Sequence, residues 1–138
     1  MSSVLAMITA TTAQRASATA PESMYHLLTK PAAGGSPIIE AVATFTNNPV
    51  TFVLNTHWHE DHTGGNETLG KGGAIIVAHD NVRKRMSSEH FNAAFKRTTP
   101  ASPEGALPVV TFAEGITFHW NGEEIRVYHV PPAHTDGD

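Results

Sequence analysis

The chain has 138 residues, of which 40% are hydrophobic and 16% are charged, and its formal net charge is -4. This length fits one globular domain with its own core, and the acidic balance argues against a nucleic-acid partner. No cysteine occurs, which excludes disulfides and thiolate metal ligands. No apolar run reaches the roughly 18 residues that a membrane span needs.

The N-terminal segment, residues 1–23, is rich in Ala, Thr and Ser and is predicted to be unstructured. The small residues at 16–18 resemble the cleavage site of an export signal, but no basic residue precedes Arg15, as such a signal would require. A disordered leader and an export signal therefore both stay open, and so does the choice between a periplasmic or secreted and a cytoplasmic protein. Residues 24–138 form the predicted domain.

The first predicted elements alternate with loops that contain Pro and Gly. Residues 24–30 are predicted to form a short strand. A helix is predicted at 36–47, because Ser36 is a suitable N-cap and apolar residues recur at helical spacing before Pro49. Residues 50–55 are β-branched and apolar, as expected of a buried strand.

The second half of the chain is predicted to contain short helices, further strands and a hairpin. Asn121 and Gly122 form the strongest short-range hairpin signal, and they lie between two runs of alternating apolar residues. Residues 80–97 are polar and are predicted to form two helical pieces that break near Ser87. The other predicted elements are a helix at 66–70, strands at 74–78 and 109–112, a loop at 98–108 and hairpin strands at 116–120 and 123–130.

A cluster of metal-ligand side chains directly follows the strand at 50–55: His57, His59, Asp61 and His62. Zinc accepts imidazole nitrogen and carboxylate oxygen at about 2.0–2.2 Å. So many ligands over so short a run exceed what one ion accommodates, and the spacing suggests two neighbouring metals about 3.5–4 Å apart. The alternative is a fortuitous histidine-rich surface loop, but such a loop seldom follows a buried strand.

The run from Asn55 to Asn66, Asn-Thr-His-Trp-His-Glu-Asp-His-Thr-Gly-Gly-Asn, resembles the signature of the metallo-β-lactamase superfamily. The resemblance extends from the helix at 37–47 to the end of the chain, where His134 matches the next ligand of that family. It implies an α/β (α+β) fold, the αββα sandwich. It also implies a zinc-dependent hydrolase that activates water on a metal centre to cleave a small-molecule substrate, namely an ester, thioester, lactone or lactam.

The same resemblance implies roles for the ligand-type residues. His57, His59 and His134 would hold the first zinc, and Asp61 and His62 would help to hold the second. Asp61 would also orient the attacking water, which makes it the implied catalytic residue. The cofactor is one or two Zn2+ ions, although histidine and carboxylate ligands also accept iron or manganese.

The chain departs from the family pattern on both sides of the motif. Strands that the family has before it, and a bridging Asp or Cys and a last His after His134, are not found, so only part of the sandwich is expected. The chain could be a truncated hydrolase, could complete its site in a homodimer or swapped dimer, or could be a minimal half with the first metal site alone. A non-catalytic metal-binding fragment is the competing hypothesis.

Several other residues carry weaker interpretations. Glu60 is either a proton shuttle or a solvated side chain, Trp58 is either a pocket wall or core, and the basic run at 83–85 either meets an anionic substrate or is a solvated helix face. Thr56 and Asn66 are candidates for supporting the ligands. Four further histidines are interpreted as surface or core residues rather than ligands: His79, His90, His119 and His129.

Overall fold

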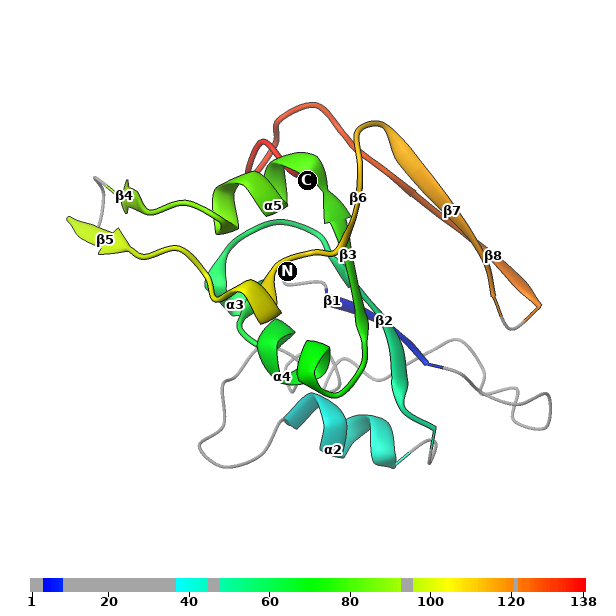
Figure 1. Ribbon diagram of the computed structural model, residues 1–138. Coiled ribbons are helices and arrows are strands. Elements are labelled where there is room, and N and C mark those ends of the chain that lie inside the picture. Colours follow the sequence, from blue (N-terminus) through cyan, green and yellow to red (C-terminus); the bar gives the residue numbers. More distant parts are fainter. Residues whose placement is uncertain (1–3, 9–36, 45–47, 93–95, 121) are drawn as a thin grey trace.

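The computed structural model describes residues 4–8, 37–44, 48–92, 96–120 and 122–138 (Figure 1). The strand expected at 24–30 lies outside the described residues, and so does most of the segment at 1–23.

A four-stranded mixed sheet forms the centre of the molecule. Its order is β1 (Val4–Ile8), β2 (Val50–Asn55), β3 (Ile75–His79) and β6 (Val110–Phe112). The strands β2, β3 and β6 are parallel, whereas β1 pairs with β2 in the antiparallel direction. The structure thus differs from the expectation of an unstructured N-terminus at Val4–Ile8, which forms an edge strand. The leader or signal role of residues 1–23 stays a prediction.

Helices cover one face of this sheet. The helices α2 (Pro37–Ala43) and α4 (Asn66–Lys71) pack on a core that contains Val53 and Ile76. The helix α5 (Asp80–Met86) packs with the short 3-10 helix η1 (Glu104–Ala106) on a second core. Since successive side chains of a strand point to opposite faces, Leu54 and Val77 face away from the helices.

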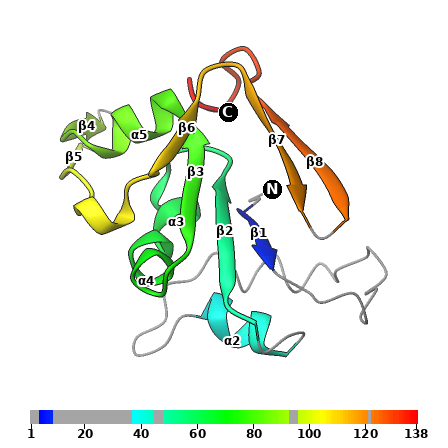
Figure 2. The ribbon, with the colours of Figure 1, turned by 45° about the vertical axis from the view of Figure 1, so that its right-hand side comes forward.

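A two-stranded hairpin covers the other face. The strands β7 (Gly115–Trp120) and β8 (Glu123–Tyr128) alternate exposed and half-buried residues, and the half-buried set packs around Leu54 and Val77. Phe118 lies edge-on to Phe52 of β2, with 5.2 Å between the ring centroids. The molecule therefore has three layers, namely helices, sheet and hairpin, as Figure 2 shows. The predicted α/β class is confirmed, and the layers agree with part of an αββα sandwich.

The second helical piece predicted within 80–97 is wrong. The helix α5 ends at Met86. Just after this end, the hydroxyl groups of Ser87 and Ser88 both donate hydrogen bonds to Lys84 O. An antiparallel strand pair follows, β4 (His90–Asn92) and β5 (Arg97–Thr99), which projects from the body of the molecule as an arm (Figure 1). Short strands bearing β-branched threonine favour this pairing over a helix.

The predicted helices at 36–47 and 66–70, the strands at 50–55, 74–78 and 109–112 and the hairpin agree to within a few residues over the part of the chain that the structure describes. The predicted loop at 98–108 instead contains the end of β5 and the helix η1, and the short helix Glu60–Thr63 was not predicted. Over the described ranges, every helix is too short or too polar to cross a lipid bilayer.

Candidate metal centre

The histidine cluster occupies the turn between β2 and α3 (Glu60–Thr63). His59 is the N-cap residue of α3 and its backbone is extended, so the chain changes direction here. Thr63 Oγ1 donates to His59 O at 3.1 Å, which holds the turn closed. A Cβ at position 64 would lie only 2.8 Å from Glu60 O. The tight C-terminal end of α3 therefore requires a glycine at this position.

Three imidazole rings converge at this turn. His57 and His59 come from the turn itself, and His134 comes from the C-terminal loop. One ring nitrogen from each lies within 4.8 Å of the others, and each pair of ring centroids is 4.9 Å apart. The rings are nearly perpendicular to one another, at 82° to 88°. Among the described residues, these three histidines are the group of at least three ligand-type side chains that could hold one metal ion.

The distance between two of the donor atoms is close to that expected at a tetrahedral metal ion. Two nitrogen ligands of zinc lie roughly 3.3 Å apart when each bond is about 2.05 Å long. His134 Nε2 and His59 Nδ1 are 3.1 Å apart. His57 Nε2 is buried and has no hydrogen-bond partner among the described residues. A buried polar atom without a partner costs free energy, and an ion bound by this nitrogen would remove that cost.

Burial and neighbouring histidines favour the neutral form of His57 and His59, which is the form that binds a metal. The pKa of His57 falls from 6.5 to about 4, first because the ring is buried and then because His62 and His59 oppose its positive charge. Burial and the neighbouring His134 also lower the pKa of His59. At neutral pH both rings therefore carry a lone pair that is free of a proton.

The other two predicted ligands lie beside the three imidazoles, in α3. Asp61 Oδ2 is 3.3 Å from His62 Nε2, and the ring centroids of His57 and His62 are 3.9 Å apart. The side chain of His62 is 5% exposed, whereas that of Asp61 is 58% exposed and faces outward. Thr56 Oγ1 lies within hydrogen-bonding distance of Nδ1 of both His57 and His62, at 3.2 and 3.5 Å.

Residues outside the predicted ligand set hold the His134 loop in place. Asn81 Nδ2 donates to Asp136 O at 2.7 Å, and the guanidinium group of Arg85 binds the Asp136 carboxylate. Asp138 accepts from the backbone N–H of Thr135. A sequence signal was available only for Arg85, as part of the basic run, and its observed partner is an acidic residue of the same chain.

The four further histidines lie outside the ligand group. His79 and His129 stack at 3.8 Å and 8° between their rings, and His79 Nε2 donates to Ala113 O. His90 lies edge-on to Trp58, and His119 is exposed on the hairpin. Asn66 supports the fold rather than the ligands, because it exchanges hydrogen bonds with Asn55 and donates to Ala106 O.

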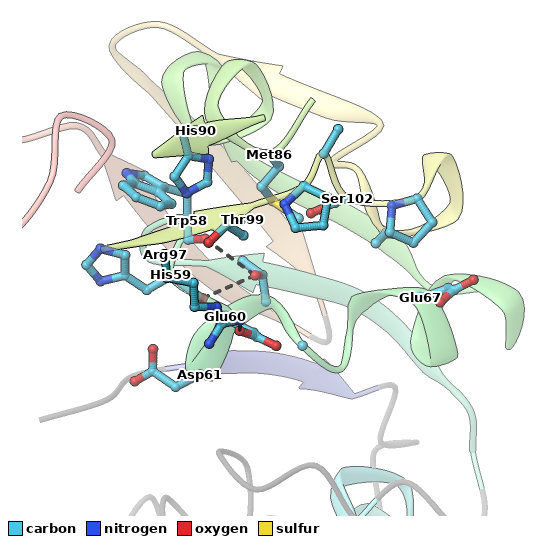
Figure 3. A pocket seen from close by; sticks show the side chains of 16 residues that line it. Trp58, His59, Glu60, Asp61, Glu67, Met86, His90, Arg97, Thr99 and Ser102 are labelled. Carbon is cyan, nitrogen blue, oxygen red and sulfur yellow. Dashed lines mark hydrogen bonds and ion pairs between the residues drawn. The ribbon is translucent and has the colours of Figure 1, made fainter. Parts of the chain in front are cut away.

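A pocket of about 820 Å3 opens directly beside the metal ligands (Figure 3). His59 and Asp61 lie at one end, and Glu67 lies at the other. The apolar walls include Trp58 and Met86, and the β4–β5 arm contributes Arg97.

The three layers, together with the convergence of three histidines beside the end of a sheet strand, define an α/β protein with a candidate metal site. The family model of the metallo-beta-lactamase superfamily matches residues 22–138 of the chain. The chain belongs to this superfamily, as the residues from Asn55 to Asn66 had indicated.

Proposed function

We propose that this protein is a metal-dependent hydrolase whose first zinc ion is held by His57, His59 and His134. The convergence of one nitrogen from each of these residues within 4.8 Å carries the proposal. Membership of the metallo-beta-lactamase superfamily supports it, because most members of that superfamily are hydrolases.

Asp61 and His62 are the proposed ligands of a second ion. Their facing atoms, Oδ2 and Nε2, are 3.3 Å apart, and His62 is packed against His57 of the first site. One carboxylate and one imidazole would hold a second ion less tightly than three imidazoles hold the first. The occupancy of the second site would therefore depend on the metal concentration.

Zinc in this position would act as a Lewis acid and would lower the pKa of water toward neutrality. The residues of the chain supply the rest of the chemistry. Asp61 is exposed at the mouth of the site, where its carboxylate can accept a hydrogen bond from the attacking water. Thr56 Oγ1 is placed to fix the Nδ1 side of His57 and so to orient its Nε2 toward the metal.

The proposed substrates are small esters, thioesters, lactones or lactams. The net charge of -4 argues against a nuclease, because an acidic protein would repel a polyanionic nucleic acid. Zinc is proposed ahead of manganese because the first site offers only imidazole nitrogens, which suit zinc and iron but not manganese.

The test combines metal analysis with hydrolysis of a panel of neutral esters, thioesters and lactones. We expect one or two zinc ions per chain, loss of first-site metal and of turnover in His59→Ala, and a retained first-site ion but lost turnover in Asp61→Asn. His119→Ala removes an exposed histidine outside the site and serves as the matched control. Unchanged metal content and turnover in His59→Ala would overturn the proposal, and metal binding without turnover that depends on Asp61 would leave a non-catalytic metal-binding protein.

A further inference from the structure

The pocket beside the metal centre has a rigid apolar wall. Met86 and Ala106 are buried there, and Trp58 packs against the same core. The indole ring of Trp58 is held edge-on between two histidines, at 4.5 Å from His59 and 4.7 Å from His90. A wall that is already ordered costs little conformational entropy when a ligand binds to it.

A second segment of the wall, next to Met86, is also fixed before any ligand binds. Residues 100–103 line the pocket, and Ser102 N–H donates to Met86 O at 2.8 Å. Two prolines in this segment, Pro100 and Pro103, further restrict its backbone. The volume of about 820 Å3 falls in the range of roughly 300–1,000 Å3 that is typical of small-molecule sites.

The charges that line the pocket have partners nearby. Glu60 pairs with Arg97 at 3.2 Å, and Glu67 pairs with Lys71 at 2.7 Å. Asp61 is the third lining carboxylate, and it lies at the histidine end of the pocket, 3.3 Å from His62 Nε2. Away from Asp61, the described lining carboxylates are therefore paired with cations, so the apolar part of the pocket offers no unpaired charge to attract an ionic group.

We propose that this pocket binds an uncharged apolar part of the substrate, either an aromatic ring or an acyl chain. This inference rests on the proposed function, since it places that group next to the bond that is cleaved at His59 and Asp61. The protein would then prefer neutral esters or thioesters with a bulky apolar group over small or ionic ones.

Direct binding tests the pocket without relying on turnover. Equilibrium dialysis of metal-free protein with para-nitroanisole, a neutral aromatic that contains no cleavable ester, should show one bound molecule per chain with a dissociation constant of about 1 mM or below. Ala101 is exposed and lines the pocket, so Ala101→Phe should fill the space without disturbing the core and should weaken binding by about fivefold or more. Ala113→Phe, at an exposed position outside the lining, is the matched control.

Charge preference is tested on zinc-loaded protein with three probes of similar size: para-nitroanisole, para-nitrobenzenesulfonate and para-nitrobenzyl-trimethylammonium. We expect the neutral probe to bind about tenfold more tightly than either ion at the site that Ala101→Phe blocks. Absence of binding in the wild-type chain, equal binding by Ala101→Phe, or an ion that binds as tightly as the neutral probe would overturn the inference. Binding of the neutral probe without any ester hydrolysis would uphold the pocket and refute the hydrolase.

Discussion

Arg85 and Asp136 form an ion pair that ties α5 to the loop that carries His134. Arg85 Nη2 lies 2.8 Å from Asp136 Oδ2, and Arg85 Nε lies 3.2 Å from the same oxygen. Asn81, one turn earlier in α5, donates to the backbone carbonyl of Asp136. His134, a proposed ligand from a distant part of the chain, is thereby positioned in advance, which would lower the entropy cost of assembling the proposed site.

Loss of this pair should weaken metal binding without removing a ligand. In Arg85→Ala the His134 loop has more freedom, and we expect the zinc dissociation constant to rise by about two- to fivefold, because half-exposed ion pairs contribute at most about 1 kcal/mol. Competition titration with a chromophoric chelator measures this constant. Arg126→Ala, which breaks an exposed pair with Glu124 on the hairpin, should have no effect on the constant.

A charge-swapped double variant, Arg85→Asp with Asp136→Arg, should recover part of the lost affinity. If Arg85→Ala and wild type bind zinc equally tightly, the loop does not depend on α5 for its position.

The same pair makes stability depend on pH in acid. The hydrogen bond from Arg85 holds the pKa of Asp136 below its usual value, so the ionised carboxylate is favoured in the folded state. The contribution is fully present above the unfolded pKa of about 3.9 and is lost as the pH falls through the lower, folded pKa. The difference in unfolding free energy between wild type and Asp136→Asn should therefore be constant near neutral pH and should shrink below about pH 4.

Urea unfolding of metal-free protein at a series of pH values measures this difference. The difference should also shrink in about 1 M salt, because exposed pairs are screened. A difference that grew on acidification would contradict the assignment of this stability to the ion pair.

The buried amide pair of Asn55 and Asn66 should matter more for stability than for metal binding. Each amide donates to the other, at 3.0 and 2.8 Å, and Asn66 also donates to Ala106 O. In Asn66→Ala these partners are left buried and unpaired, which should cost about 2–3 kcal/mol of unfolding free energy. Chemical denaturation gives the value, and Thr68→Ala on the exposed face of α4 is the control.

A loss below about 0.5 kcal/mol in Asn66→Ala would mean that water replaces the amide. A large change in zinc affinity at unchanged stability would instead restore Asn66 to the supporting role that the sequence suggested.

Much of what could be predicted from the sequence depended on residues that are close together along the chain. The ligands His57, His59, Asp61 and His62 are close in sequence, and the buried strand before them was readable from its β-branched residues. The hairpin was predictable as well, since its turn glycine, Gly122, has a φ of 79° and its strands alternate. Such features depend on neighbours along the chain.

Features that depend on distant contacts were less accessible. The position of His134, next to His59 but 75 residues away, followed only from the family resemblance. The pairing of β4 with β5 was missed because the polar run at 80–97 lacks a periodicity that separates strand from helix. Asp136 gave no signal at all, because its role arises from the packing of the C-terminal loop on α5.

Replacement of His57 by leucine should separate the stability of the metal-free chain from its response to zinc. Nε2 of His57 is buried without a described partner, so an apolar side chain of similar volume should leave the metal-free unfolding temperature unchanged or raise it slightly. In the wild type, zinc at about 100 times its dissociation constant should add about 2.7 kcal/mol of stability. His57→Leu should lose nearly all of this gain because the tri-histidine group is broken.

Thermal unfolding in excess chelator and in excess zinc gives both quantities from one preparation. His119→Leu, at an exposed histidine outside the site, should keep the full response to zinc. If His57→Leu were strongly destabilised in chelator, the ring would support the fold through its packing and not mainly through a ligand. If the variant kept the zinc response, the ion would bind elsewhere. The combination of an unchanged metal-free protein and an abolished response is expected only when His57 is held in the core for the sake of the metal.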